Sequence, residues 1–175
     1  MNKKQFAIFS TGNILHKDEG IALYMSKYLE SNYSFNPSVD IIYGSEKGLS
    51  LLDVLMQHEE VLVLDAIGME DDPGSLYHFP MSTFRGFGTD ESSEDKGVLE
   101  CLNLIEQRGD TLPEVSLLAI VPDSLDEEIG LSDALKHSFE AYRLMIEKTL
   151  EKKGYSMEAK PEQQTLDSVI ESFAK

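Results

Sequence analysis

Two acidic side chains, Glu19 and Asp65, stand where the first and third apolar runs of the chain give way to loops. Asp65 directly follows four apolar residues, 61–64, and Glu19 follows a glycine turn after residues 5–10. A carboxylate at the end of a buried strand needs a partner or a cation, because burying an unpaired charge is costly. Paired carboxylates can bind a metal cation or move protons during hydrolysis, so we take Glu19 and Asp65 as the candidate functional groups.

The opening loop, residues 12–20, reads GNILHKDEG and leads into a helical pattern. We expect Asp18 to be the N-cap of that helix, since short acidic side chains accept hydrogen bonds from the first free backbone N–H groups. Glu19 would then lie in the first helical turn. There it either offsets the positive end of the helix dipole or points over the edge of the sheet, and the sequence leaves both open.

Familiar catalytic patterns are missing from the chain. Residues 12–14 lack the further glycines of a dinucleotide-binding turn, and there is no phosphate-binding P-loop, zinc-protease helix or serine nucleophile elbow. For Asp65 the alternative to a functional role is a hydrogen-bonded loop cap. Cys101 lies on the apolar side of its helix and is expected to be a core residue, and His58, His78 and His137 are expected on the surface or in turns.

The strands and helices that must position these residues alternate along the chain. Apolar or alternating runs predict strands at residues 5–10, 39–43, 61–64 and 115–121, with an edge strand at 75–79. Helical spacing predicts helices at residues 21–29, 49–55, 97–107 and 131–152. Residues 81–93 carry three glycines and little periodic apolar content, which predicts a mobile loop near the site.

This alternation predicts an α/β fold: a three-layer sandwich with a mostly parallel, twisted sheet of about five strands and helices on both faces. Such sheets bind ligands at the carboxyl ends of their strands, where Glu19 and Asp65 are expected. We expect residues 1–153 to form this domain. Residues 154–175 would be a C-terminal extension with a short helix, since Leu166, Val169, Ile170 and Phe173 share one helical face.

Composition narrows the classes of partner and compartment. The formal net charge of −17 makes contact with a nucleic-acid backbone repulsive, and no window approaches the length of apolar chain that spans a bilayer. The charge could serve solubility alone, or it could favour a basic partner or a metal cation. A single cysteine, Cys101, excludes an intrachain disulfide and a cysteine-based metal cage, which fits a reducing cytoplasm.

Four stretches together resemble the hydrogenase maturation endopeptidases. They are the opening motif at residues 12–20, the run VLVLDAI at 61–67, the turn PGS at 73–75 with the strand after it, and VPDSL at 121–125 followed by IGLS at 129–132. The resemblance extends from about residue 5 to residue 153. It implies an enzyme that removes the C-terminal extension of a [NiFe] hydrogenase large subunit after nickel insertion, with the precursor as its partner and no organic cofactor.

The resemblance implies that, in this family, the nickel belongs to the substrate and is contacted by a Glu, an Asp and a His of the endopeptidase. Glu19 and Asp65 occupy the first two positions, whereas the position of the His falls near Glu94. Glu94 or Asp95 could act as an oxygen donor in its place, or His16 could reach in from the opening loop. Imidazole suits nickel better than a carboxylate does, so this difference bears on activity. The turn at residues 44–46, GSE, also departs from the Gly-Gly-Thr-like turn common in the family, so recognition of the substrate is expected to differ.

Two functions are therefore open at this level. One is an active endopeptidase that uses Glu19 and Asp65, with Glu94 as a third nickel contact. The other is a relative that binds a hydrogenase or another metalloprotein precursor as a maturation factor without cutting it. The two carboxylates favour the first function, and the absence of the usual histidine favours the second.

Overall fold

The computed structural model describes residues 4–44, 49–80 and 96–175. Five strands form one sheet in the order β3-β1-β4-β6-β5. The strands are β1 (Lys4–Thr11), β3 (Asp40–Gly44), β4 (His58–Ala66), β5 (Leu76–Pro80) and β6 (Glu114–Ile120). Strands β3, β1, β4 and β6 are parallel and β5 pairs antiparallel with β6, so the expected sheet is confirmed.

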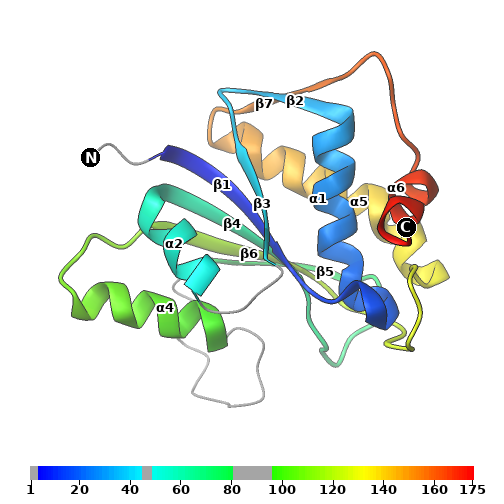
Figure 1. Ribbon diagram of the computed structural model, residues 1–175, viewed down its shortest axis with the longest axis horizontal. Helices are drawn as coiled ribbons and strands as arrows, with labels where there is room; N and C mark the ends of the chain where they lie inside the picture. Colours follow the sequence, from blue (N-terminus) through cyan, green and yellow to red (C-terminus); the bar gives the residue numbers. More distant parts are fainter. Residues whose placement is uncertain (1–3, 45–48, 81–95) are drawn as a thin grey trace.

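Helices cover both faces of this sheet (Figure 1). One face carries α1 (Ile21–Asn32), α5 (Asp133–Lys152) and α6 (Leu166–Phe173), and the other carries α2 (Leu49–Gln57) and α4 (Lys96–Gln107). Alternate residues of β4 pack on opposite faces of the sheet. Leu62 and Leu64 belong to the apolar core beneath α1, α5 and α6, and Val61 and Val63 belong to the core beneath α2 and α4. The continuous apolar run of β4 is therefore that of a strand buried on both sides.

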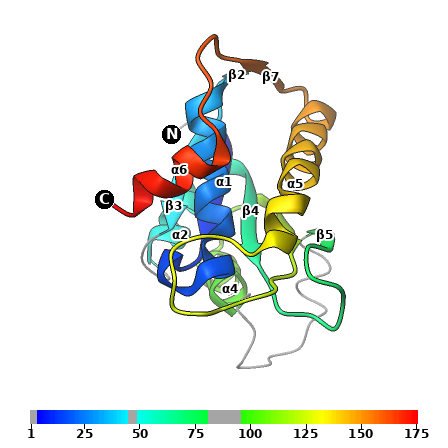
Figure 2. The ribbon, with the colours of Figure 1, turned by 90° about the vertical axis from the view of Figure 1, so that its right-hand side faces the viewer.

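A second, two-stranded sheet joins the C-terminal part of the chain to the end of α1. Strand β7 (Ser156–Ala159) pairs antiparallel with β2 (Tyr33–Asn36), and Figure 2 shows the pair bridging the ends of α1 and α5. The buried side chain of Asn32 then holds the segment that follows, because its Oδ1 accepts from Gln164 N–H at 2.6 Å and its Nδ2 donates to Gln164 O at 3.0 Å. The expected C-terminal helix is α6, and its Val169 and Ile170 are buried.

The parallel strands bring their carboxyl ends to one edge of the sheet. Ser10 of β1 lies beside Leu64 of β4, and Ala66 of β4 lies beside Ile120 of β6. The loops that leave this edge are those at residues 12–20, 67–75 and 121–132. The predicted mobile loop at residues 81–93 and the turn residues 45 and 46 lie outside the described residues. In the described part of the chain, no helix combines the length and apolar character needed to cross a membrane.

Candidate functional site

The opening loop turns back on itself so that Glu19 returns to the end of β1. Gly12 has a φ of 149°, and a Cβ at that position would stand 2.0 Å from the carbonyl oxygen of Glu19. The same carbonyl accepts a hydrogen bond from Asn13 N–H at 3.1 Å. Only a glycine permits this approach, so Gly12 fixes the backbone position of Glu19. The Glu19 side chain is partly exposed.

Asp65 occupies the end of the neighbouring strand and is buried. Its Oδ1 accepts a hydrogen bond from the N–H of Ala66 at 2.9 Å, as expected for a loop cap. Its charge also acts on α5: burial, and then the carboxylate of Asp65, raise the pKa of the buried Tyr142 phenol well above 10. A carboxylate that caps a loop can also act on a substrate, so the two interpretations of Asp65 do not exclude each other.

The segments of the chain that carry Glu19 and Asp65 lie side by side. Their strands β1 and β4 are hydrogen-bonded neighbours, and the short 3-10 segment η1 (Ile14–Gly20), which carries Glu19, contacts β4. Carboxylates there are placed to bind a cation or to accept a proton from water. In the described residues no three His, Cys, Asp or Glu side chains gather closely enough to hold a metal, and Glu94 lies outside those residues. That Glu19 and Asp65 share one cation remains a prediction.

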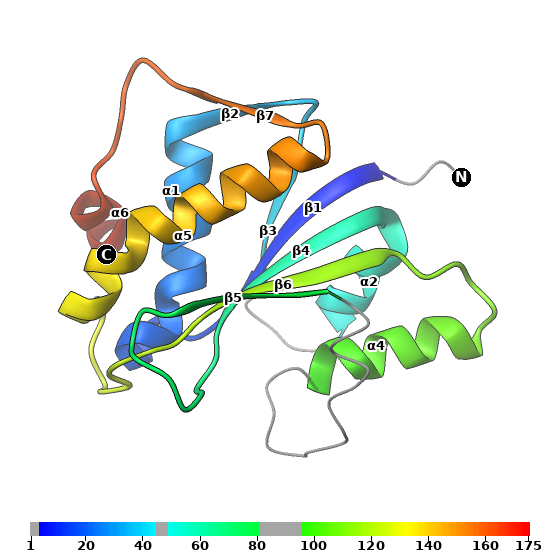
Figure 3. The ribbon, with the colours of Figure 1, turned by 180° about the vertical axis from the view of Figure 1, so that it is seen from behind.

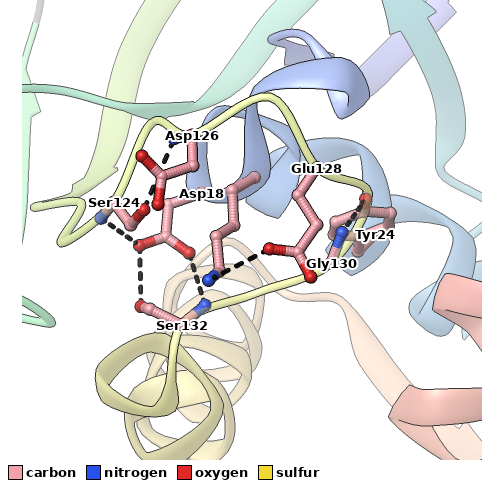
Figure 4. Close-up of polar contacts among 8 residues, drawn as sticks. Asp18, Tyr24, Ser124, Asp126, Glu128, Gly130 and Ser132 are labelled. Carbon is pink, nitrogen blue, oxygen red and sulfur yellow. Dashed lines mark hydrogen bonds and ion pairs between the residues drawn. The ribbon is translucent and has the colours of Figure 1, made fainter.

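Asp18 is not the N-cap of α1, so that expectation was wrong. Gly20 holds the capping position and makes no side-chain cap bond. The buried carboxylate of Asp18 instead faces the loop after β6 (Figure 4). Its Oδ2 accepts from Asp123 N–H at 2.9 Å, from Ser124 N–H at 3.0 Å and from Ser132 Oγ at 2.7 Å, while Oδ1 accepts from Ser132 N–H at 2.8 Å. Four donors thus compensate its buried charge.

The backbone around Asp18 adds to the same connection. Asp18 N–H donates to Ser124 O at 3.1 Å and Lys17 N–H donates to Glu128 O at 2.8 Å. Gly130 N–H donates to the Tyr24 hydroxyl at 3.2 Å, which ties the far end of the loop to α1 (Figure 4). We call this set of bonds the Asp18 latch. It joins residues 12–20 to residues 121–132, and these two loops therefore present one connected surface beside Glu19.

Lys17 shows that the latch imposes its own backbone geometry. Its φ of 45° and ψ of −107° are values that glycine adopts far more readily than a residue with a Cβ. Strain of this kind typically costs about 1–3 kcal/mol and persists only where the surroundings over-determine it. The hydrogen bonds of Lys17 and Asp18 to the loop after β6 supply that constraint.

The other residues singled out from the sequence take no part in this site. Cys101 is buried in the core, and burial raises the pKa of its thiol, which disfavours a nucleophilic role. His78 and His137 are exposed, as expected. The expectation for His58 was wrong: it is buried at the start of β4, where its ring nitrogens contact Val54 O at 2.8 Å and Asp40 Oδ2 at 2.9 Å.

Comparison with known proteins supports the class of protein. A family model described as hydrogenase maturation protease matches residues 23–150. The hydrogenase 2 maturation protease of Escherichia coli K12 is 25% identical over 76% of this chain and 82% of its own length. The hydrogenase expression/formation protein HoxM of Cupriavidus necator is 29% identical over 68% of this chain and 60% of its own length.

Solved structures of the same class share the fold. The hydrogenase maturating endopeptidase HybD from E. coli aligns with a TM-score of 0.80 at 23% identity, covering 89% of this chain and 98% of that chain. The [NiFe] hydrogenase maturation protease HybD from Thermococcus kodakarensis aligns with a TM-score of 0.62 at 21% identity, covering 83% and 98%. At these identities the likeness establishes the three-layer architecture.

The fold is that of the solved hydrogenase maturation proteases, and the family whose model matches the chain is a class of peptide hydrolases. Because the family model spans more than half of the chain, the chain belongs to the hydrogenase maturation protease family. The resemblance drawn from the sequence is therefore confirmed, as is the assignment to an enzyme class. Asp65 lies within the matched residues, whereas the opening loop and Glu19 precede them.

Proposed function

We propose that this protein removes the C-terminal extension of a [NiFe] hydrogenase large subunit after nickel has been inserted into that subunit. The observation that carries the proposal is the position of Glu19 and Asp65 at the ends of the adjacent parallel strands β1 and β4, within a hydrogenase maturation protease fold. Its partner is the large-subunit precursor. The single cysteine, Cys101, favours the cytoplasm as the place of reaction.

In this proposal the nickel arrives with the substrate and needs no resident cofactor. Glu19 and Asp65 offer carboxylate oxygens to it, and Glu94 is the third contact where the family resemblance implies a histidine. Asp65 has its orientation set by the Ala66 N–H, whereas Glu19 is partly exposed and can approach an incoming metal. An oriented carboxylate, Asp65, beside a more exposed one, Glu19, suits the binding of a metal that another protein carries.

The cleavage step requires a water molecule, a base and a polarised peptide bond. We infer that a carboxylate of the pair takes a proton from water as the water oxygen attacks the carbonyl carbon of the scissile peptide. The C–N bond then breaks, and the departing amine takes up the proton that the carboxylate removed from water. The metal of the precursor positions the scissile bond, so processing depends on prior nickel insertion.

Mass measurement of the large subunit tests this proposal. Nickel-loaded precursor incubated with the protein should lose the mass of its C-terminal extension, and nickel-free precursor should keep it. Glu19→Gln and Asp65→Asn should each reduce processing at least a hundredfold, and Glu19→Gln should do so with an unchanged thermal midpoint. The exposed control variants Asp110→Asn and Glu151→Gln should match the wild type. Stable binding of the precursor without any loss of mass would support the non-cleaving alternative instead.

A further inference from the structure

Three loops form a continuous surface at the carboxyl edge of the sheet. The Asp18 latch joins residues 12–20 to residues 121–132. Residues 67–75 join the same surface, because Ile67 N–H donates to Ile120 O at 3.0 Å and Gly74 N–H donates to Val121 O at 2.8 Å. Figure 3 shows these segments, dark blue, green and yellow-green, side by side at one end of the sheet. We call this surface the three-loop face.

The three-loop face exposes large apolar side chains on a fixed backbone. The side chains of Leu15 and Leu125 are 59% and 50% exposed, and each lies within three residues of a backbone group bonded in the latch. Met69 of the third loop is also exposed. Apolar side chains displayed on an ordered backbone provide contact area that a partner can cover without first ordering the loop.

The same face has a strong negative charge. Its exposed acids are Glu70, Asp71, Asp72, Asp123, Asp126, Glu127 and Glu128. Lys17 is the one lysine or arginine in the three loops, and it pairs with Glu128 at 3.5 Å. Acids around apolar contacts attract a partner that carries lysine or arginine beside apolar side chains, and they repel acidic surfaces.

We propose that the three-loop face is the docking surface for the large-subunit precursor, and that it recognises a segment of the precursor in which basic side chains flank apolar ones. This inference rests on the proposed function and extends it from the cleaved bond to the contacts that select the substrate. Leu15 and Leu125 are the apolar anchors. The acids increase the rate of association and exclude acidic proteins, while Glu19 and Asp65 act on the bond delivered beside them.

A pair of leucine substitutions tests the apolar anchors. Leu15→Ser with Leu125→Ser should weaken the affinity for nickel-loaded precursor at least tenfold, raising the KM for tail removal while kcat changes little. The matched control is Leu104→Ser with Leu144→Ser, on α4 and α5, where the leucines are 42% and 41% exposed. The control should retain wild-type affinity within twofold, and both proteins should keep their thermal midpoints.

A charge reversal tests the acidic rim. Asp126→Lys with Glu127→Lys should reduce the association rate at least tenfold at low salt, and the difference from wild type should shrink as sodium chloride is raised. The control is Glu151→Lys with Glu158→Lys, at the end of α5 and in β7, which changes the net charge equally at exposed positions at the opposite end of α5 from the loops. That control should have only a small effect.

The outcomes separate the two proposals. If the wild type binds and shortens the precursor but the loop variants behave as their controls do, the docking surface is wrong and the proposed function stands. If the wild type neither binds nor shortens nickel-loaded precursor, both are wrong. A selective loss of affinity in the loop variants, with kcat retained, supports the docking surface.

Discussion

Replacing Asp18 with alanine removes the acceptor of four hydrogen bonds in a place that water does not reach. A hydrogen bond to a charged group is worth about 1.5–3 kcal/mol, and a donor left unsatisfied in the interior costs about 1–3 kcal/mol. These contributions do not add fully, because the exposed loop at residues 121–132 can open and hydrate its N–H groups. We therefore expect a loss of about 3–4 kcal/mol, a large part of the stability of a typical domain, about 5–15 kcal/mol.

The assay is urea unfolding of Asp18→Ala beside Asp126→Ala, an exposed acid of the same loop whose loss should change stability by less than about 0.5 kcal/mol. Asp18→Asn should fall between them, since its amide nitrogen would oppose one of the N–H groups that now donate to the carboxylate. Amide exchange at Asp123 and Ser124 should accelerate more in Asp18→Ala than exchange in β4. If Asp18→Ala lowers the free energy of unfolding by less than about 1 kcal/mol, or leaves exchange at those amides unchanged, the stabilising role assigned to the latch is wrong.

Three further predictions follow from individual residues. Gly12→Ala should abolish tail removal and lower stability by more than about 1 kcal/mol, since its Cβ would displace the Glu19 carbonyl, whereas Gly109→Ala, with open space around its Cβ, should affect stability alone. Glu94→His should preserve or increase nickel-dependent affinity for the precursor in a titration with and without the metal, and Glu94→Ala should reduce it. Below pH 10 the phenol of Tyr142 keeps its proton in both the folded and the unfolded state. Above that pH the phenol ionises first in the unfolded state, so the free energy of unfolding falls as the pH rises. In urea titrations from pH 9 to 11, Tyr142→Phe should therefore show a shallower fall than the wild type.

The sheet and its helices could be predicted because they are encoded locally. The run before Asp65 is apolar at every position, as a strand covered on both faces requires. The helical spacing of apolar residues in α5 continues almost to Gly154, where the helix has ended. Strand ends then gave the positions of Glu19 and Asp65, because parallel strands share one carboxyl edge.

The latch could not be predicted, because its partners are far apart in the chain. Asp18 and Ser132 are separated by 114 residues, and the local pattern favours an N-cap for an aspartate before a helix. Ser132 itself carried a usable signal, since it caps α5 by accepting from Leu135 N–H at 3.3 Å. His58 was misjudged for a related reason: its partner Asp40 belongs to β3, and polarity alone suggested a surface position.

The small sheet of β2 and β7 has a consequence for synthesis of the chain. Tyr33 of β2 pairs with Ala159 of β7, so β2 cannot form this sheet until a strand more than a hundred residues later has been synthesised. Until then the carbonyl of Asn32, at the end of α1, lacks its bonds from Lys160 and Gln163, and Tyr24 lacks the edge-on contact of the Phe173 ring. We therefore expect the nascent protein to leave the side of α1 that faces α6 uncovered until residues 156–173 have emerged from the ribosome. During that interval it is a target for the chaperones that bind unfinished chains.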